Sequence, residues 1–127
     1  MSNNDVKENK PKILIVDDAL FMRNLIGNII KEAGYTDVHF AGDGREAINI
    51  ASELKPDIIT LDISMPEING LDAIEGILTA SPCSKIIMVT AVTDQLIVKQ
   101  AIQKGAVDFV KKPFDRFEIE DVLRRHI

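Results

Sequence analysis

The sequence has little cysteine and no long apolar run. Its single cysteine, Cys83, excludes an internal disulfide, a metal site of several thiolates and a CxxC redox motif, and it indicates a reducing compartment. No apolar run approaches the roughly 20 residues that span a bilayer. Residues 1–5 also lack the basic and apolar regions of a signal peptide. We therefore expect a cytoplasmic protein with no membrane insertion.

Basic residues are too few and too scattered to bind a phosphate backbone. Lys and Arg number 15 against 20 Asp and Glu, which gives a formal net charge of -5. The local basic groups, Lys111-Lys112 and Arg124-Arg125, are too small to form a positive stripe. We therefore exclude nucleic acid as a partner. The 46% of hydrophobic residues among 127 is enough to build the core of one domain.

Short apolar runs alternate with segments of helical periodicity. Five runs have the composition of buried parallel strands: residues 12–16, 38–41, 57–61, 85–90 and 107–110. Apolar residues recur at helical spacing after each of them. This alternation predicts an α/β fold in which five helices cover both faces of a parallel sheet, with right-handed crossovers.

Local signals locate the ends of this domain and of its helices. Residues 1–11 are polar and lack apolar periodicity, so we expect a flexible tail before one domain over residues 12–127. Asp18 has good N-cap chemistry and is expected to cap the first helix. Leu25 and Ile102 belong to the apolar series of the first and fourth helices, which predicts that both face the core.

Three carboxylates follow strand ends. Asp17 and Asp18 come directly after the first run, and Asp62 follows the third. Ligands of parallel sheets gather beyond the carboxyl ends of the strands, so we expect these acids to share one pocket. Carboxylates about 5 Å apart repel by roughly 3 kcal/mol at an effective dielectric near 20, so the cluster calls for a cation. Each acid taken alone is better explained as a cap or a solvated strand end, and only their convergence favours a binding site.

A hydroxyl and an ammonium are expected at the same edge of the sheet. Thr90 ends the fourth run, and Lys112 follows the fifth. Hard oxygen ligands in an open site suit Mg²⁺, which can bridge carboxylates and a phosphate oxygen. An ionised Asp can attack phosphorus if the metal, Lys112 and Thr90 neutralise the charge on the equatorial oxygens. The residues alone leave open which of the three acids is the nucleophile.

Four segments together resemble the receiver domains of two-component response regulators. They are Val16-Asp17-Asp18, residues 61–70, Val89-Thr90-Ala91 and residues 109–114. The resemblance covers residues 12–127, and residues 17–23 make the chain most similar to the stand-alone chemotaxis regulators of that family. It implies a flavodoxin-like sheet with strand order 2-1-3-4-5 and a signalling module rather than an enzyme.

The resemblance also implies a role for each residue at this edge. Asp62 would accept a phosphoryl group from a histidine kinase, and Lys112 would pair first with Asp62 and then with the phosphoryl group. Asp18, Asp62 and the backbone carbonyl of Ser64 would bind Mg²⁺ directly. Asp17 would act largely through a metal-bound water.

A switch is implied as well. Thr90 would move toward the phosphoryl group, and Phe109 would rotate into the space that it leaves. The surface of the fourth helix, fifth strand and fifth helix would then change and bind a flagellar motor switch protein. The Lys112-Pro113 peptide is expected to be cis by the same resemblance.

Departures from the family pattern carry their own expectations. Ser64 and Val92 stand two residues after the phosphoacceptor and the switch threonine, where the family tunes hydrolysis. Neither has a carboxylate or an amide to orient water, so we expect slow self-dephosphorylation, which leaves room for a partner phosphatase. Phe109 stands where many motor-binding relatives have tyrosine, which leaves the output partner open.

Other functions share parts of this pattern. A phosphorelay intermediate in another pathway would pass the phosphoryl group to a phosphotransfer protein. An Asp-nucleophile phosphatase would use the same acid, Mg²⁺ and lysine, but it normally places a general acid where Ser64 stands. A flavodoxin-like electron carrier would share the architecture, yet Asp17 and Asp18 would repel a flavin phosphate.

Overall fold

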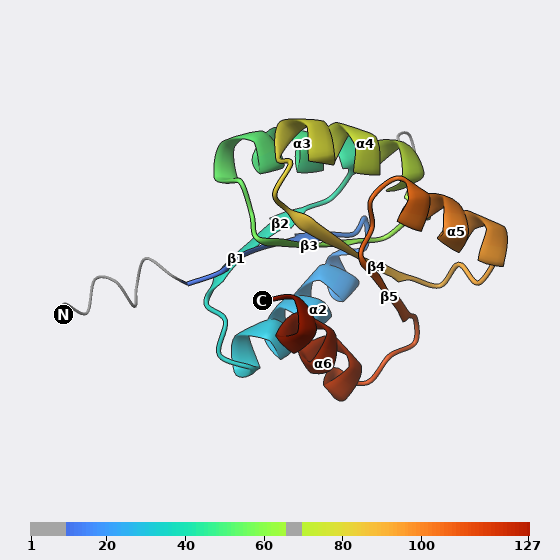
Figure 1. Cartoon of the computed structure of the whole chain (residues 1–127). Coiled ribbons are helices and arrows are strands. Elements are labelled where there is room, and N and C mark those ends of the chain that lie inside the picture. Colours follow the sequence, from blue (N-terminus) through green and yellow to red (C-terminus); the bar gives the residue numbers. More distant parts are fainter. Residues whose placement is uncertain (1–9, 66–69) are drawn as a thin grey trace.

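A five-stranded parallel sheet lies at the centre of the computed structural model, within residues 10–65 and 70–127, the part of the chain that the structure describes (Figure 1). Its strands are β1 (Lys12–Val16), β2 (Asp37–Ala41), β3 (Ile58–Leu61), β4 (Lys85–Thr90) and β5 (Asp108–Lys111). They lie side by side in the order β2-β1-β3-β4-β5. This confirms the predicted fold class and strand order. Residues 1–9 of the expected tail lie outside the described residues.

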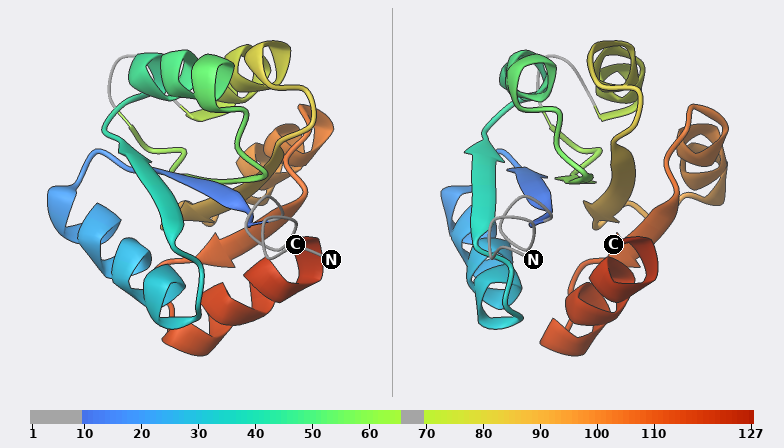
Figure 2. Two further views of the ribbon diagram at one scale, coloured as in Figure 1. Left: turned by 90° about the vertical axis from the view of Figure 1, so that its left-hand side faces the viewer. Right: turned by 60° about the vertical axis from the view of Figure 1, so that its left-hand side comes forward.

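Helices cover both faces of the sheet (Figures 1 and 2). One face carries α2 (Leu20–Glu32) and α6 (Arg116–His126), and the other carries α3 (Gly44–Leu54), α4 (Gly70–Ala80) and α5 (Gln95–Gln103). No helix within the described residues has the length and apolar character needed to span a bilayer.

The three central strands β1, β3 and β4 are buried on both sides, which explains their continuous apolar runs. Side chains alternate between the faces along β1. Ile13 and Ile15 pack into the core under α2 and α6, whereas Leu14 and Val16 pack into the core under α3, α4 and α5. The sheet thus separates two apolar cores.

Three local expectations are wrong. Asp18 does not cap α2, because the N-cap residue is Ala19, which makes no side-chain capping bond. Leu25 and Ile102 are 37% and 54% exposed, since the helical apolar stripe is narrower than the spacing suggested. Strand bounds also shift by one residue: β2 begins at Asp37, β3 begins at Ile58, and β5 runs from Asp108 to Lys111.

Thr60 has an unpaired polar atom inside the sheet. The residue is 1% exposed, and its register partners are Ile15 and Ile87. Among the described residues its hydroxyl is the one buried side-chain polar atom that lacks a hydrogen-bond partner. A buried hydroxyl without a partner costs free energy because it has lost its water.

We predict that Thr60→Val raises the free energy of unfolding by about 1 kcal/mol, because it replaces the unpaired hydroxyl with a methyl group of similar volume. Urea unfolding of both chains measures the change. Ser84→Ala is the matched control, because the Ser84 hydroxyl bonds Ser81 Oγ and the Pro56 carbonyl, and its loss should destabilise the fold. A less stable Thr60→Val chain would contradict the prediction.

Candidate functional site

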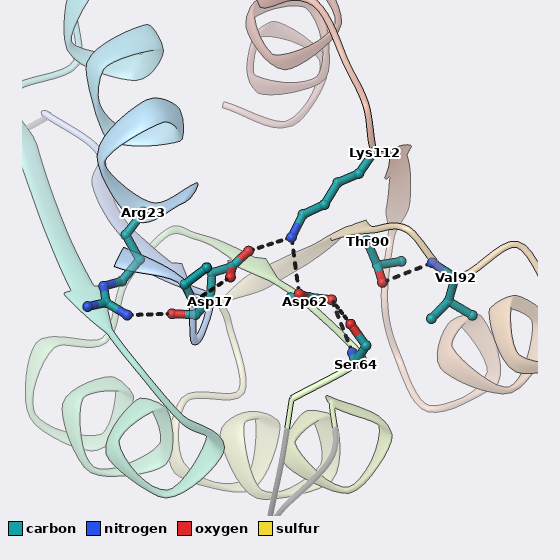
Figure 3. A network of polar contacts seen from close by, with 8 residues as sticks. Asp17, Arg23, Asp62, Ser64, Thr90, Val92 and Lys112 are labelled. Atoms are coloured by element: carbon teal, nitrogen blue, oxygen red, sulfur yellow. Dashed lines mark hydrogen bonds and ion pairs between the residues drawn. The ribbon is translucent and has the colours of Figure 1, made fainter. Parts of the chain in front are cut away.

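The polar residues beyond the strand ends lie close together (Figure 3), and backbone hydrogen bonds between neighbouring segments hold them there. Asp62 N donates to Val16 O at 3.1 Å, and Lys112 N donates to Thr90 O at 2.9 Å. These bonds extend the pairing of neighbouring strands by one residue past their ends. Asp17, which directly follows β1, is aligned with them. The carboxyl edge of the sheet therefore carries the groups that the sequence predicted there.

The three acids form one cluster. Asp17, Asp18 and Asp62 each present a carboxylate oxygen, and these oxygens lie within 4.8 Å of one another. Asp17 and Asp62 are 1% and 5% exposed, whereas Asp18 faces solvent. At such separations each pair of charges repels by roughly 3 kcal/mol at an effective dielectric near 20. The cluster is open to water on the side of Asp18.

Lys112 is the cation that the structure places among these acids. Its Nζ donates to Asp17 Oδ2 at 2.6 Å and to Asp62 Oδ2 at 3.1 Å. Burial lowers the pKa of Lys112, but its hydrogen bonds to Asp17 and Asp62 and their charges outweigh burial and raise it. Three carboxylates outnumber one ammonium, so the cluster keeps a net negative charge. The Lys112-Pro113 peptide is cis, as expected.

Asp62 is held at both carboxylate oxygens. While Oδ2 faces Lys112, Oδ1 accepts from the backbone N–H and the hydroxyl of Ser64, both at 3.0 Å. Burial raises the pKa of Asp62, but the Ser64 N–H, Lys112 and the Thr90 hydroxyl together bring it below its ordinary value. Asp62 is therefore ionised at neutral pH, which is the form of a carboxylate that can act as a nucleophile.

Gly70 brings α4 directly against the segment that carries Asp62. Its N–H donates to Ile63 O at 2.9 Å. A Cβ at position 70 would lie 2.4 Å from Ile63 Cα and 2.9 Å from Asp62 O, so only glycine fits this approach. Gly70 is thus a helix-entry residue. Residues 66–69 of the loop before it lie outside the described residues.

Thr90 and Phe109 lie on the neighbouring strands β4 and β5. Thr90 is fully buried, and its Oγ1 accepts from Val92 N at 3.3 Å. Phe109 pairs in register with Met88 and packs, half-buried, against the core under α3, α4 and α5. The Thr90 hydroxyl therefore lies next to Asp62, and Phe109 lies on the strand beside it.

Arg23 is a site residue that sequence reasoning missed. It projects from α2, and its Nη1 donates to the backbone carbonyl of Asp17 at 2.7 Å (Figure 3). The acceptor of this bond is a main-chain carbonyl, which every residue has, so the amino-acid sequence does not mark the partner of Arg23. The available signal was an arginine at the fourth position of a helix that begins at Leu20, two residues after Asp18.

The residues present fit Mg²⁺. Every side-chain ligand that the cluster offers is a carboxylate oxygen, its net charge is negative, and one member faces water. Mg²⁺ prefers hard oxygen ligands, keeps several waters and binds through few carboxylates. An all-oxygen set with no nitrogen or sulfur donor disfavours zinc and other softer metals.

Comparison with known proteins finds similarity over most of the chain. The family model for the response regulator receiver domain matches residues 13–124. The chemotaxis protein CheY of Thermotoga maritima is 47% identical over 114 residues, which cover 90% of this chain and 95% of that protein.

Solved structures have the same fold. The chemotaxis protein CheY4 of Vibrio cholerae matches with a TM-score of 0.85 and 28% identity, covering 92% of this chain and 98% of that one. The receiver domain of a sensor histidine kinase from Pseudomonas aeruginosa has a magnesium ion coordinated in its active-site cleft. It matches with a TM-score of 0.82 and 29% identity, covering 91% of this chain and 96% of that one.

We predict that Lys112→Met lowers the free energy of unfolding by about 3 kcal/mol in metal-free buffer, because it leaves buried carboxylates without their cation. Urea unfolding measures this, and added Mg²⁺ should restore part of the loss.

The pKa of Asp62 also makes the stability of the native chain depend on pH. Because this pKa is lowered in the folded state, Asp62 stabilises the fold at pH values above the ordinary carboxyl pKa of 3.8, and that contribution disappears as pH falls through the lowered pKa.

The pH dependence of the variant should have the opposite sign. Without Lys112, burial dominates and the pKa of Asp62 rises, so the folded state binds a proton more tightly than the unfolded state. The stability of Lys112→Met should therefore increase as pH falls from 7 to 5. A flat profile over that range would show that Lys112 does not control the charge of Asp62.

Proposed function

Because this chain belongs to the response regulator receiver domain family, we propose that it accepts a phosphoryl group on Asp62 and signals through a change in its binding surface. The observation that carries the proposal is the state of Asp62. It is a buried, ionised carboxylate that accepts hydrogen bonds from Ser64 and pairs with Lys112, in a cluster where three carboxylates face one ammonium. Such a group can act as a nucleophile, and any change in its charge alters its ion pair with Lys112.

Phosphoryl transfer needs little more than these groups. A carboxylate oxygen of Asp62 attacks the phosphorus of a phosphohistidine on the kinase. A P–O bond forms as the P–N bond breaks, and the bonding electron pair returns to the histidine nitrogen. Asp62 is already ionised, so no base is required, and its bonds to Ser64 hold it in place for in-line attack.

Charge neutralisation is the second requirement. Lys112 can follow the charge as it moves from the carboxylate to the phosphoryl oxygens, and the Thr90 hydroxyl can donate to the same group. Asp17, Asp18 and Asp62, with Ser64 beside them, are the residues that would hold Mg²⁺. When bound, this ion would supply the positive charge that the cluster lacks.

The output would follow from the neighbouring strands. Thr90 and Lys112 are joined by a backbone hydrogen bond, so a Thr90 hydroxyl drawn to the phosphoryl group would disturb the β4–β5 edge and the bond to Val92. Phe109 lies on the adjacent strand and would take the space that is vacated. The remodelled surface would be that of α5, β5 and α6, where Leu96 and Phe117 are 63% and 69% exposed.

Chemotaxis is the pathway that the relatives favour. The similarity to the CheY of Thermotoga maritima extends over nearly the whole of both chains, which supports a chemotaxis histidine kinase as phosphodonor and a flagellar motor switch protein as output partner. Phe109 lacks the hydroxyl of a tyrosine, so this partner would have to be recognised without that hydrogen bond. A phosphotransfer protein as the bound partner would instead identify a phosphorelay.

We predict that the native chain gains one phosphoryl group from a small-molecule phosphodonor in Mg²⁺, and that Asp62→Asn gains none, because an amide is not a nucleophile. Intact-mass measurement gives the result directly. A chelator should abolish labelling of the native chain. Labelling of both chains would move the phosphoacceptor to another residue, and labelling of neither would refute the proposal.

We also predict that the phosphorylated native chain loses its phosphoryl group slowly and that Val92→Glu speeds the loss several-fold. Val92 is half-buried next to Thr90, and a carboxylate there could orient the attacking water. The decay of the phosphorylated mass after donor removal measures the rate. Val92→Leu is the control for side-chain size and should decay like the native chain. Equal rates for Val92→Glu and the native chain would contradict the prediction.

A further inference from the structure

We propose that Arg23 is a positioning residue that fixes the peptide between Asp17 and Asp18 and thereby sets the affinity of the acid cluster for its divalent cation. This rests on the proposed function, because it takes Mg²⁺ as the ligand of the cluster. Within residues 10–65 and 70–127, Arg23 forms no ion pair with a carboxylate. Its side chain instead donates a hydrogen bond to the main chain, at the point where β1 turns into α2.

The turn after β1 has little else to hold it. The N-cap residue Ala19 makes no side-chain capping bond. Ala19 N donates to Asp17 Oδ1 at 3.0 Å, and Arg23 N donates to Ala19 O at 3.0 Å. The Asp17 carbonyl lies past the end of the strand, and the Arg23 guanidinium holds it at 2.7 Å. That carbonyl belongs to the peptide that joins two members of the cluster, so its orientation directs both carboxylates.

Arginine suits this position for a structural reason. The guanidinium is planar and always charged, and its hydrogen bond to a carbonyl is charge-assisted and directional. It lies against Gly42, where a Cβ would be 3.3 Å from Arg23 Nη1 and 3.9 Å from Cζ. Gly42 thus leaves the space that the guanidinium occupies. A lysine could keep the charge but not the planar contact.

An electrostatic role and a positioning role of Arg23 predict opposite effects on Mg²⁺ affinity, so an experiment can decide between them. If Arg23 acted only through its positive charge, removing it would leave the acids more negative and tighten Mg²⁺ binding. If it acts by holding the Asp17 peptide, removing it frees the carboxylates and weakens binding. Residues that orient metal ligands typically contribute about 10-fold to 100-fold in affinity.

The test is a Mg²⁺ titration of the full chain followed by amide NMR, on the native protein and Arg23→Met. Methionine keeps the apolar stem and removes the donor. We expect the dissociation constant to rise about 10-fold. The rate of phosphorylation by a small-molecule donor should need correspondingly more Mg²⁺ yet approach the native rate at saturation. Unchanged or tighter Mg²⁺ binding would overturn the proposal.

Three further variants separate position from charge and from folding. Arg124→Met makes the same charge change near the C-terminal end of α6, where Arg124 is exposed and pairs with Asp121, and it should bind Mg²⁺ as the native chain does. Gly42→Ala keeps every charge but pushes on the guanidinium, and Arg23→Lys keeps the charge without the planar fork. Both should weaken binding less than Arg23→Met, and native affinity in both would count against positioning.

The outcomes distinguish the two proposals. If the native chain fails to bind Mg²⁺, the cation site of the proposed function falls, and the role of Arg23 falls with it. If the native chain binds Mg²⁺ and Arg23→Met binds it equally well, only the role of Arg23 is refuted. Urea unfolding in metal-free buffer shows that each variant is folded, and should Arg23→Met not fold, the comparison of Gly42→Ala with the native chain decides.

Discussion

The arrangement of side chains at the carboxyl edge of the sheet depends on one ammonium group that lies between two buried carboxylates. Lys112 reaches from beyond β5 to Asp17 beyond β1 and Asp62 beyond β3, at 2.6 and 3.1 Å. Asp17 and Asp62 are nearly inaccessible to solvent, so without this contact their charges would strongly oppose folding. The contact joins ends of strands that are not neighbours in sequence. It balances the edge only in part, because a third acid and the net negative charge remain.

The excess negative charge of the acid cluster lies where a cation from solvent can reach it. Asp18, the exposed member of the cluster, opens the site to solvent, while the other two acids are packed beneath it. A fold selected only for stability would not gather three acids around one lysine, because each close pair repels by roughly 3 kcal/mol at an effective dielectric near 20. Locally unfavourable arrangements of this kind are expected at functional sites.

The sequence predicted the sheet and the meeting of Asp17, Asp18, Asp62 and Lys112, because buried parallel strands are continuous apolar runs whose polar ends share one edge. The strand order came from the resemblance to receiver domains, since apolar runs do not say which strands are neighbours. Sequence reasoning failed where a main-chain group is the partner. Asp18 looked like the cap of α2, yet Asp17 accepts the Ala19 N–H. Arg23 binds a carbonyl that any residue would supply. The hydrogen bonds of Ser64 to Asp62 likewise depend on a turn that composition does not encode.

The same shortage of positive charge explains why phosphorylation would act as a switch and not merely as a label. A phosphoryl group adds about -1.5 to -2 charges and three acceptor oxygens beside a cluster that one lysine already fails to balance. Lys112 already uses two of its three N–H donors on Asp17 and Asp62, so three new acceptor oxygens call for further donors. Thr90 is the nearest buried hydroxyl on the neighbouring strand, and its long 3.3 Å bond from Val92 is the weakest link there. Because Thr90 is tied through its backbone to the segment carrying Lys112, its movement would be passed to β5 and the helices beside it.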